Sequence, residues 1–120
     1  MGYFFDTYAL IEITKRNPNY LRYSEEPIST GFLNLIEFYY ANLRDFDEGK
    51  AKSSHLLFRN NIIPIFDEAL FEAMKLKLRL KNKNLSYVDC MGYVLAIRSN
   101  LKFLTGDKEF KTMANVEFVQ

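Results

Sequence analysis

Short apolar runs along the chain alternate with longer segments in which apolar residues recur every three or four positions. The short runs predict strands, the second of which also fits a loop, at residues 3–5, 27–30, 61–65, 102–105 and 116–119. The periodic segments predict helices at residues 7–16, 32–44, 55–58, 67–81, 86–100 and 109–113. Short strands that are apolar on both sides and alternate with helices are typical of a parallel sheet covered on both faces. The pattern therefore predicts the α/β class, as a three-layer α/β/α sandwich with a central parallel sheet of about five strands.

The second predicted helix has one apolar face, formed by Leu33, Ile36, Tyr40 and Leu43. Such a stripe is typical of the face that a helix packs against a core, so we expect this face to be buried. The polar segment 45–52 that follows predicts a turn. The strict alternation at 74–81 also fits a strand, but its length and the helical pattern before it favour a helix.

The chain is long enough, at 120 residues of which 48% are hydrophobic, to bury a core of its own as one domain. Sixteen Lys and Arg residues against fifteen Asp and Glu residues leave a net charge of +1. This balance excludes a strongly basic nucleic-acid-binding protein but not an enzyme with a local basic patch. Basic residues concentrate between 75 and 83, as either a solvated helix end or a surface that tracks phosphates. A single cysteine and a single histidine leave no Cys/His zinc site.

The apolar stretch near the N-terminus does not fit a signal peptide, because Asp6 and Glu12 interrupt it and no basic region precedes it. No segment of the sequence approaches the ~18 consecutive apolar residues of a membrane-spanning helix. We therefore expect a soluble, cytoplasmic protein without a membrane partner.

Four acidic residues stand beside predicted strand ends or apolar helix faces. Asp6 follows the first strand and Asp107 follows the fourth, whereas Glu37 borders the apolar face of the second helix. Asp89 lies in the first turn of the helix that begins at Ser86. Three of the four also fit structural roles: Asp6 and Asp107 as helix N-caps, and Asp89 in a capping box. Glu37 fits such a role least, because no basic residue stands four positions after it.

Taken together, these acids fit a shared binding site better than separate structural roles. Ligands of open α/β sheets bind outside the carboxyl ends of the strands, where the strand order reverses. In a 3-2-1-4-5 order, Asp6 and Asp107 emerge side by side there, and Glu37 and Asp89 can complete a ring. Crowded carboxylates require a counter-charge, and oxygen-only ligands select hard cations such as Mg²⁺ or Mn²⁺. The set predicts metal-activated water that attacks a phosphodiester.

Four segments carry these acids, in one order along almost the whole chain: Phe5–Thr7, Asn34–Glu37, Leu85–Asp89 and Leu104–Phe110. They resemble the signature segments of PIN-domain ribonucleases, and the small VapC-type toxins of prokaryotic toxin–antitoxin pairs are the most similar members. The resemblance implies that residues 1–120 form a single PIN-like, Rossmann-like domain with RNA-cleaving activity that depends on Mg²⁺ or Mn²⁺.

The resemblance also assigns roles to individual residues. It implies that the catalytic and metal-binding acids are Asp6, Glu37, Asp89 and Asp107. It implies supporting positions around the pocket at Thr7, Ser86, Thr105 and Glu109.

The expected binding partners come from the same resemblance and from the aromatic residues of the first two predicted helices. These helices carry more apolar positions than one stripe each can hide: Tyr8, Leu10, Ile11, Phe32, Leu35, Phe38 and Tyr39. We expect a remainder, with Phe38 in it, to form an exposed groove beside the acids. The resemblance implies an antitoxin segment in that groove, an RNA substrate and a homodimer of the free chain.

Two other functions fit the fold class. A receiver-like phosphoacceptor domain requires a second acid beside Asp6, where Phe5 stands, and a lysine after the last strand, where the chain has Val119 and Gln120. A non-catalytic PIN-like interaction module is expected to have lost one or more of the acids, and all four are present. The sequence therefore favours the nuclease.

Overall fold

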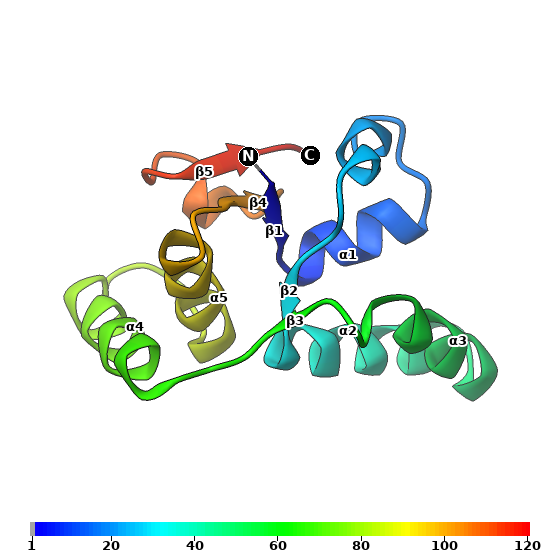
Figure 1. Cartoon of the computed structure of the whole chain (residues 1–120), viewed down its shortest axis with the longest axis horizontal. Helices are drawn as coiled ribbons and strands as arrows, with labels where there is room; N and C mark the ends of the chain where they lie inside the picture. The colour runs from blue at the N-terminus through cyan, green and yellow to red at the C-terminus, as the bar shows by residue number, and fades with distance from the viewer. Residues whose placement is uncertain (1) are drawn as a thin grey trace.

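The computed structural model describes residues 2–120, in which short parallel strands alternate with helices (Figure 1). Its helices are α1 (Thr7–Thr14), α2 (Phe32–Asp45), α3 (Glu48–Phe58), α4 (Asp67–Arg79) and α5 (Tyr87–Arg98), with 3-10 turns η1 (Leu21–Glu25) and η2 (Lys108–Phe110). Its strands are β1 (Tyr3–Phe5), β2 (Thr30–Gly31), β3 (Ile62–Ile63), β4 (Lys102–Thr105) and β5 (Val116–Phe118). The predicted α/β sandwich with a parallel sheet is confirmed.

The strands form two hydrogen-bonded pieces, β1-β4-β5 and β2-β3. A single parallel bridge between Phe4 and Ser29 joins them. The Phe5 amide donates to the Ser29 carbonyl at 2.8 Å, and the buried Thr30 hydroxyl donates to the Phe5 carbonyl at 2.7 Å. The spatial order is therefore β3-β2-β1-β4-β5, with β1 and β4 at the centre. The continuous sheet has three strands rather than the five expected, because β2 and β3 are too short to extend the ladder beyond one bridge.

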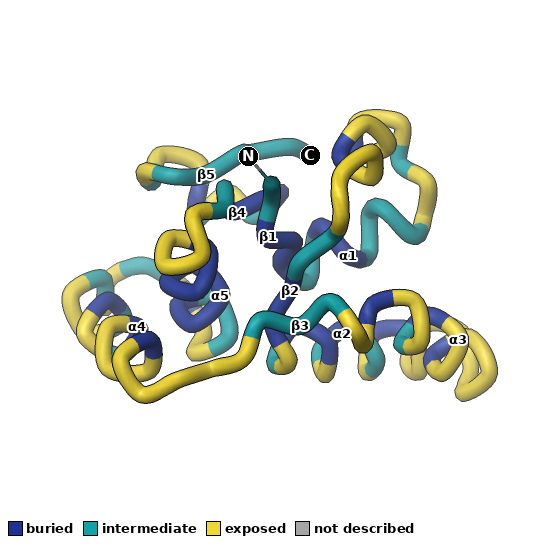
Figure 2. Tube along the Cα trace, viewed as in Figure 1, coloured by how far each residue is buried: buried dark blue, intermediate teal, exposed yellow. Residues whose placement is uncertain are grey.

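Two cores lie on the two sides of this sheet, and burial concentrates on β1, β4 and α5 (Figure 2). One core joins β1 and β4 to α5, and α4 packs on the outside of α5. The other joins the strands to α1, α2 and η1. α5 approaches the sheet closely at Gly92, where a Cβ atom would lie 3.0 Å from the Phe4 ring and 3.3 Å from the Phe103 ring. This contact brings the first turn of α5 toward the central strands.

The predicted helices 7–16, 67–81 and 86–100 each end two residues earlier in the structure, and two other helical segments differ more. α3 begins at Glu48 within the segment expected to be a turn, because the Asp47 side chain caps it by accepting from the Lys50 amide at 2.8 Å. The turn η1 has no predicted counterpart. The alternating segment at 74–81 is helical as far as Arg79, in agreement with the favoured interpretation.

The apolar face of α2 that was expected to be buried faces solvent. Ile36 is 51% exposed, Tyr40 61% and Leu43 43%, and Phe32 continues the stripe. We call these four residues the α2 stripe. A helix face that packs on the core and one that is exposed to solvent can have the same spacing of apolar residues, so periodicity alone could not tell which one this is.

The opposite face of α2 enters the core, together with two polar side chains. Leu35 and Phe38 are buried there, so the prediction that Phe38 lies in an exposed groove is wrong. Asn34 and Asn42 can be buried beside them because both amides are satisfied: Asn34 donates to the Thr7 hydroxyl and Asn42 to the Phe38 carbonyl. Within residues 2–120, no helix is long and apolar enough to cross a membrane.

Candidate functional site

Asp6 connects the end of β1 to the start of α1. Its carboxylate Oδ1 accepts from the Ala9 amide at 2.8 Å and so caps the helix, and the Thr105 hydroxyl is a second hydrogen-bond partner. The side chain is only 5% exposed. Burial raises the pKa of Asp6 to about 7, and the negative charges of Asp89 and Asp107 add to this effect.

Asp107 occupies the equivalent place after β4, beyond Gly106. Its Oδ1 accepts from the Glu109 amide at 3.0 Å, and its own amide donates to the Thr105 hydroxyl at 3.0 Å. The turn between β4 and Asp107 has room only for glycine. A Cβ atom on Gly106 would lie 2.2 Å from the Tyr8 ring and 2.6 Å from the Val119 carbonyl oxygen.

Asp89 forms a reciprocal capping box at the start of α5. Its Oδ2 accepts from the Ser86 amide at 2.9 Å, and its amide donates to the Ser86 hydroxyl at 3.0 Å. Burial raises the pKa of Asp89, and the charge of Asp107 raises it further, whereas Lys77 acts in the opposite direction. The box fixes the position of the carboxylate without neutralising it.

One open cavity of about 510 Å³ is lined by three of the four predicted acids, Asp6, Asp89 and Asp107. Tyr8, Gly106, Lys108 and Gln120 complete its wall together with Thr7. Asp6 and Asp107 reach it from the carboxyl ends of the two central strands, and Asp89 reaches it from α5.

Glu37 lies beside this cavity rather than in it. Its Oε1 accepts from the Thr7 hydroxyl at 2.6 Å, and the Asn34 amide group donates to the same hydroxyl at 3.2 Å. Glu37 lines a neighbouring cavity whose wall also includes Thr7. Thr7 thus connects the fourth acid to the other three. Sequence reasoning did not single out Asn34, although it stands one turn before Glu37 on the same helix.

The remaining predicted positions differ in their contacts. Thr105 bonds to the Asp6 side chain and to the Asp107 amide, and Ser86 holds Asp89. The Oε1 atom of Glu109 accepts a hydrogen bond from the Asn84 amide at 2.7 Å, so this carboxylate holds the loop before α5.

The donor set fits a hard divalent cation. The three acids offer only oxygen atoms as ligands. The charges of Asp89 and Asp107 raise the pKa of Asp6, and the charge of Asp107 raises the pKa of Asp89, so a cation would relieve their repulsion. Across residues 2–120, no three His, Cys, Asp or Glu side chains lie close enough together to hold a metal ion as they stand. Mg²⁺ sites in proteins commonly keep several waters and take only one or two carboxylates directly.

Comparison with known proteins places this geometry in a family. The PIN domain model matches residues 3–116. A toxin–antitoxin complex from Klebsiella pneumoniae has a TM-score of 0.77 at 19% identity, over 97% of this chain and 96% of that chain. The Mycobacterium tuberculosis toxin VapC20, described as cleaving the sarcin–ricin loop, has a TM-score of 0.79 at 15% identity, over 98% and 97%.

A third structure, VapBC2 from Rickettsia felis bound to promoter DNA, has a TM-score of 0.74 at 19% identity, over 99% of this chain and 98% of that chain. A search of curated proteins found no match. At these identities the solved structures show the shared fold, whereas the family model covers nearly the whole sequence and all four predicted acids. The protein therefore belongs to the PIN domain family.

Proposed function

We propose that this protein is a Mg²⁺- or Mn²⁺-dependent endoribonuclease, the toxin of a VapBC-type pair. The observation that carries the proposal is the shared cavity of Asp6, Asp89 and Asp107 at the ends of the two central strands. Its membership of the PIN domain family and its similarity in fold to VapC20 support RNA as the substrate.

Asp6, Asp89 and Asp107 would hold the cation, and Glu37 would act from the adjoining cavity through Thr7. A bound divalent ion would supply the positive charge that lowers the pKa of a water and stabilises negative charge at phosphorus. Thr105 positions both central acids, because it bonds to the Asp6 carboxyl and to the Asp107 amide. Lys108 lies on the cavity wall, where its ammonium can contact a phosphate.

Asp107→Asn is expected to reduce RNA cleavage by about 10²–10³-fold or more, without lowering the melting temperature of the metal-free protein. Asparagine caps a helix nearly as well as aspartate, but it removes one negative charge from the site. The cation is then held less strongly, and the repulsion among the acids in the metal-free protein is smaller. Cleavage of a labelled single-stranded RNA is measured with Mg²⁺, with Mn²⁺ and with EDTA.

Asp47→Asn is the matched control, since Asp47 caps α3 through the same kind of bond to a backbone amide, away from the acidic cavity. It should leave cleavage unchanged. Cleavage that persists in EDTA, or in the Asp107→Asn variant, would contradict the metal-dependent mechanism.

We further propose that the natural inhibitor is an antitoxin segment that combines apolar and basic residues, and that the free chain forms a homodimer. Two apolar features support the inhibitor. The α2 stripe is exposed, and beside it Phe32, Leu35, Ile36, Tyr39 and His55 line a cavity of about 250 Å³. Exposed apolar surface of this kind is typical of an interface. Two of the structural neighbours are toxin–antitoxin assemblies.

Phe32→Glu is expected to weaken antitoxin binding by at least about 30-fold, as for a residue near the centre of an interface. The melting temperature and RNA cleavage should not change, because Phe32 is exposed and an acid suits the first turn of α2. Phe71→Glu on α4, where Phe71 is similarly exposed, is the control. Affinity is measured by calorimetry with the product of the neighbouring reading frame. Equal losses for the two variants would refute the assignment of the site to α2.

A further inference from the structure

The acidic cavity continues into a groove between α1 and α2. The adjoining cavity is lined by Thr7 and Ile11 from α1 and by Glu37, Ala41 and Arg44 from α2. Thr7 also lines the acidic cavity, so the two spaces meet at this residue.

The groove extends further in the same direction. The next cavity shares Ile11 and Ala41 with the last one and adds Lys15 and Lys50. A third shares Lys50 and adds Arg16, between the end of α1 and α3. We call this row of three cavities the α1–α2 groove. It follows the whole of α1, which is about 12 Å long at ~1.5 Å per residue over its eight residues.

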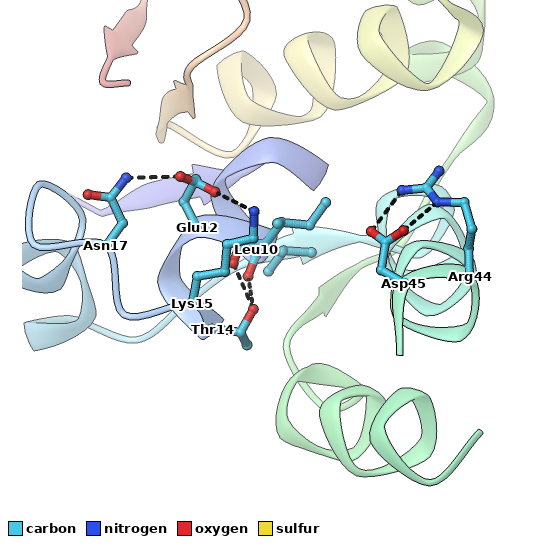
Figure 3. A network of polar contacts seen from close by, with 8 residues as sticks. Leu10, Glu12, Thr14, Lys15, Asn17, Arg44 and Asp45 are labelled. Atoms are coloured by element: carbon cyan, nitrogen blue, oxygen red, sulfur yellow. Dashed lines mark hydrogen bonds and ion pairs between the residues drawn. The ribbon is translucent and has the colours of Figure 1, made fainter. Parts of the chain in front are cut away.

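Charge changes sign along the α1–α2 groove. It begins at the carboxylates, passes Arg44 beside Glu37 and ends at Lys15, Lys50 and Arg16; two of these four cations are partly neutralised (Figure 3). Arg44 forms an ion pair with Asp45 at 2.8 Å, and Lys15 one with Glu12 at 3.7 Å.

The other two cations at this end have no such partner. Within the part of the chain that the structure describes, neither Arg16 nor Lys50 forms an ion pair. The Lys50 ammonium lies 5.7 Å from the centre of the Phe46 ring, and the Arg44 guanidinium lies 5.7 Å from that of Tyr40. Both rings line the groove and are 61% exposed. Among the described residues, Lys50 beside Phe46 thus combines an unpaired cation with an exposed aromatic ring, the two components of sites for single-stranded nucleic acid.

We infer that the RNA substrate leaves the acidic cavity as a single strand along the α1–α2 groove, with phosphates at Arg16 and Lys50 and bases stacked on Tyr40 and Phe46. This inference rests on the proposed nuclease function. An apolar protein segment matches the groove less well than the other flank of α2, where Phe32 and Tyr39 line a cavity that has no Lys, Arg, Asp or Glu among the described residues of its wall.

The test uses a fluorescein-labelled 12-nucleotide oligouridylate with EDTA present, so that the strand stays intact. Binding is followed by fluorescence anisotropy across a range of salt concentrations. Lys50→Gln is expected to weaken binding about tenfold at low salt and to reduce the slope of log Kd against log salt by about 0.7, the value for one phosphate contact on a single strand. Arg16→Gln should do the same, which provides a second variant if one of them unfolds.

Lys52→Gln is the matched control. Lys52 stands two positions from Lys50 on the same helix, forms an ion pair with Glu48 at 2.7 Å, and does not line the groove. Its replacement should leave the salt slope unchanged. Equal effects of Lys50→Gln and Lys52→Gln would overturn the groove but not the nuclease, because the wild-type protein would still bind and cleave RNA.

Two other results would also overturn the inference. If a 12-residue oligoglutamate displaces the RNA with equal affinity and depends equally on Lys50, the groove accepts an acidic protein segment rather than RNA. If the wild-type protein neither binds the oligouridylate nor cleaves RNA with Mg²⁺ or Mn²⁺, the groove and the nuclease function are both wrong.

Discussion

Asp6→Asn is expected to raise the stability of the metal-free protein and to abolish its cleavage of RNA. The asparagine oxygen can still accept from the Ala9 amide, so the cap of α1 is retained. What disappears is a carboxyl whose pKa burial raises from its ordinary 3.8 to about 7. A neutral group of the same shape avoids the cost of ionising in that position.

The gain depends on pH in a defined direction. Between pH 4 and 7 the unfolded chain loses the Asp6 proton while the folded chain keeps it, so the raised pKa makes wild-type stability fall as pH rises. The asparagine lacks this loss. The advantage of Asp6→Asn should therefore be small at pH 4, grow up to pH 7 and stay constant above it, at up to about 4 kcal/mol.

Unfolding by urea at pH 4, 5.5 and 8, without divalent ions, measures this advantage. Asp47→Asn again serves as the control, because Asp47 is an exposed N-cap and its replacement should show no such trend. The raised pKa of Asp6 would be contradicted if the Asp6→Asn protein were less stable than the wild type at pH 8, or if its stability differed from that of the wild type by the same amount at every pH.

Gly106→Ala is expected to destabilise the fold by about 3 kcal/mol and to impair cleavage in the protein that remains folded. The added methyl group would meet the Tyr8 ring, which can move, and the Val119 carbonyl oxygen, which belongs to the backbone after β5. Relief of the second contact requires the chain to shift beside Asp107. The urea midpoint and the slope of the transition report the loss.

Gly49→Ala tests the same substitution where space is available. A Cβ atom there would approach only the Asp47 carboxylate, at 3.4 Å, and Gly49 lies within the first turns of α3. Alanine is favoured over glycine in a helix by up to about 1 kcal/mol, so this variant should be more stable than the wild type. If both substitutions change the stability in the same direction, the contact with the Val119 carbonyl is not the reason that the turn requires glycine.

The alternation of strands and helices was predictable because the two central strands, β1 and β4, are short apolar runs whose residues are mostly buried. The placement of Asp6 and Asp107 followed from the same pattern, since Asp6 stands directly after β1 and Asp107 follows the end of β4 after the single residue Gly106. Their role was not decidable from the pattern alone. Each carboxylate caps a helical turn and also lines the cavity, so the structural and functional interpretations are both geometrically satisfied.

The errors have physical causes as well. On α2, Ile36 and Tyr40 have the spacing of core residues but face solvent, because a partner-facing stripe and a core-facing stripe obey the same helical period. The burial of Asn34 and Asn42 could not be predicted from the sequence, since it depends on hydrogen-bond partners that only the fold provides. The length of α3 was missed because a single cap at Asp47 converts a polar turn into a helix.

The pairing of β1 with β4 also constrains when the pocket can exist during protein synthesis. Phe5 pairs with Leu104, so Asp6 and Asp107 come together only across about a hundred residues of chain. A ribosome that adds ~5–20 residues per second needs roughly 5–20 s to make that stretch. Throughout this time β1 lacks its central neighbour, and its only other connection in the sheet is the bridge to Ser29. The nascent chain therefore carries an incomplete pocket until β4 has emerged, so the ribosome that makes the protein is not exposed to an assembled site.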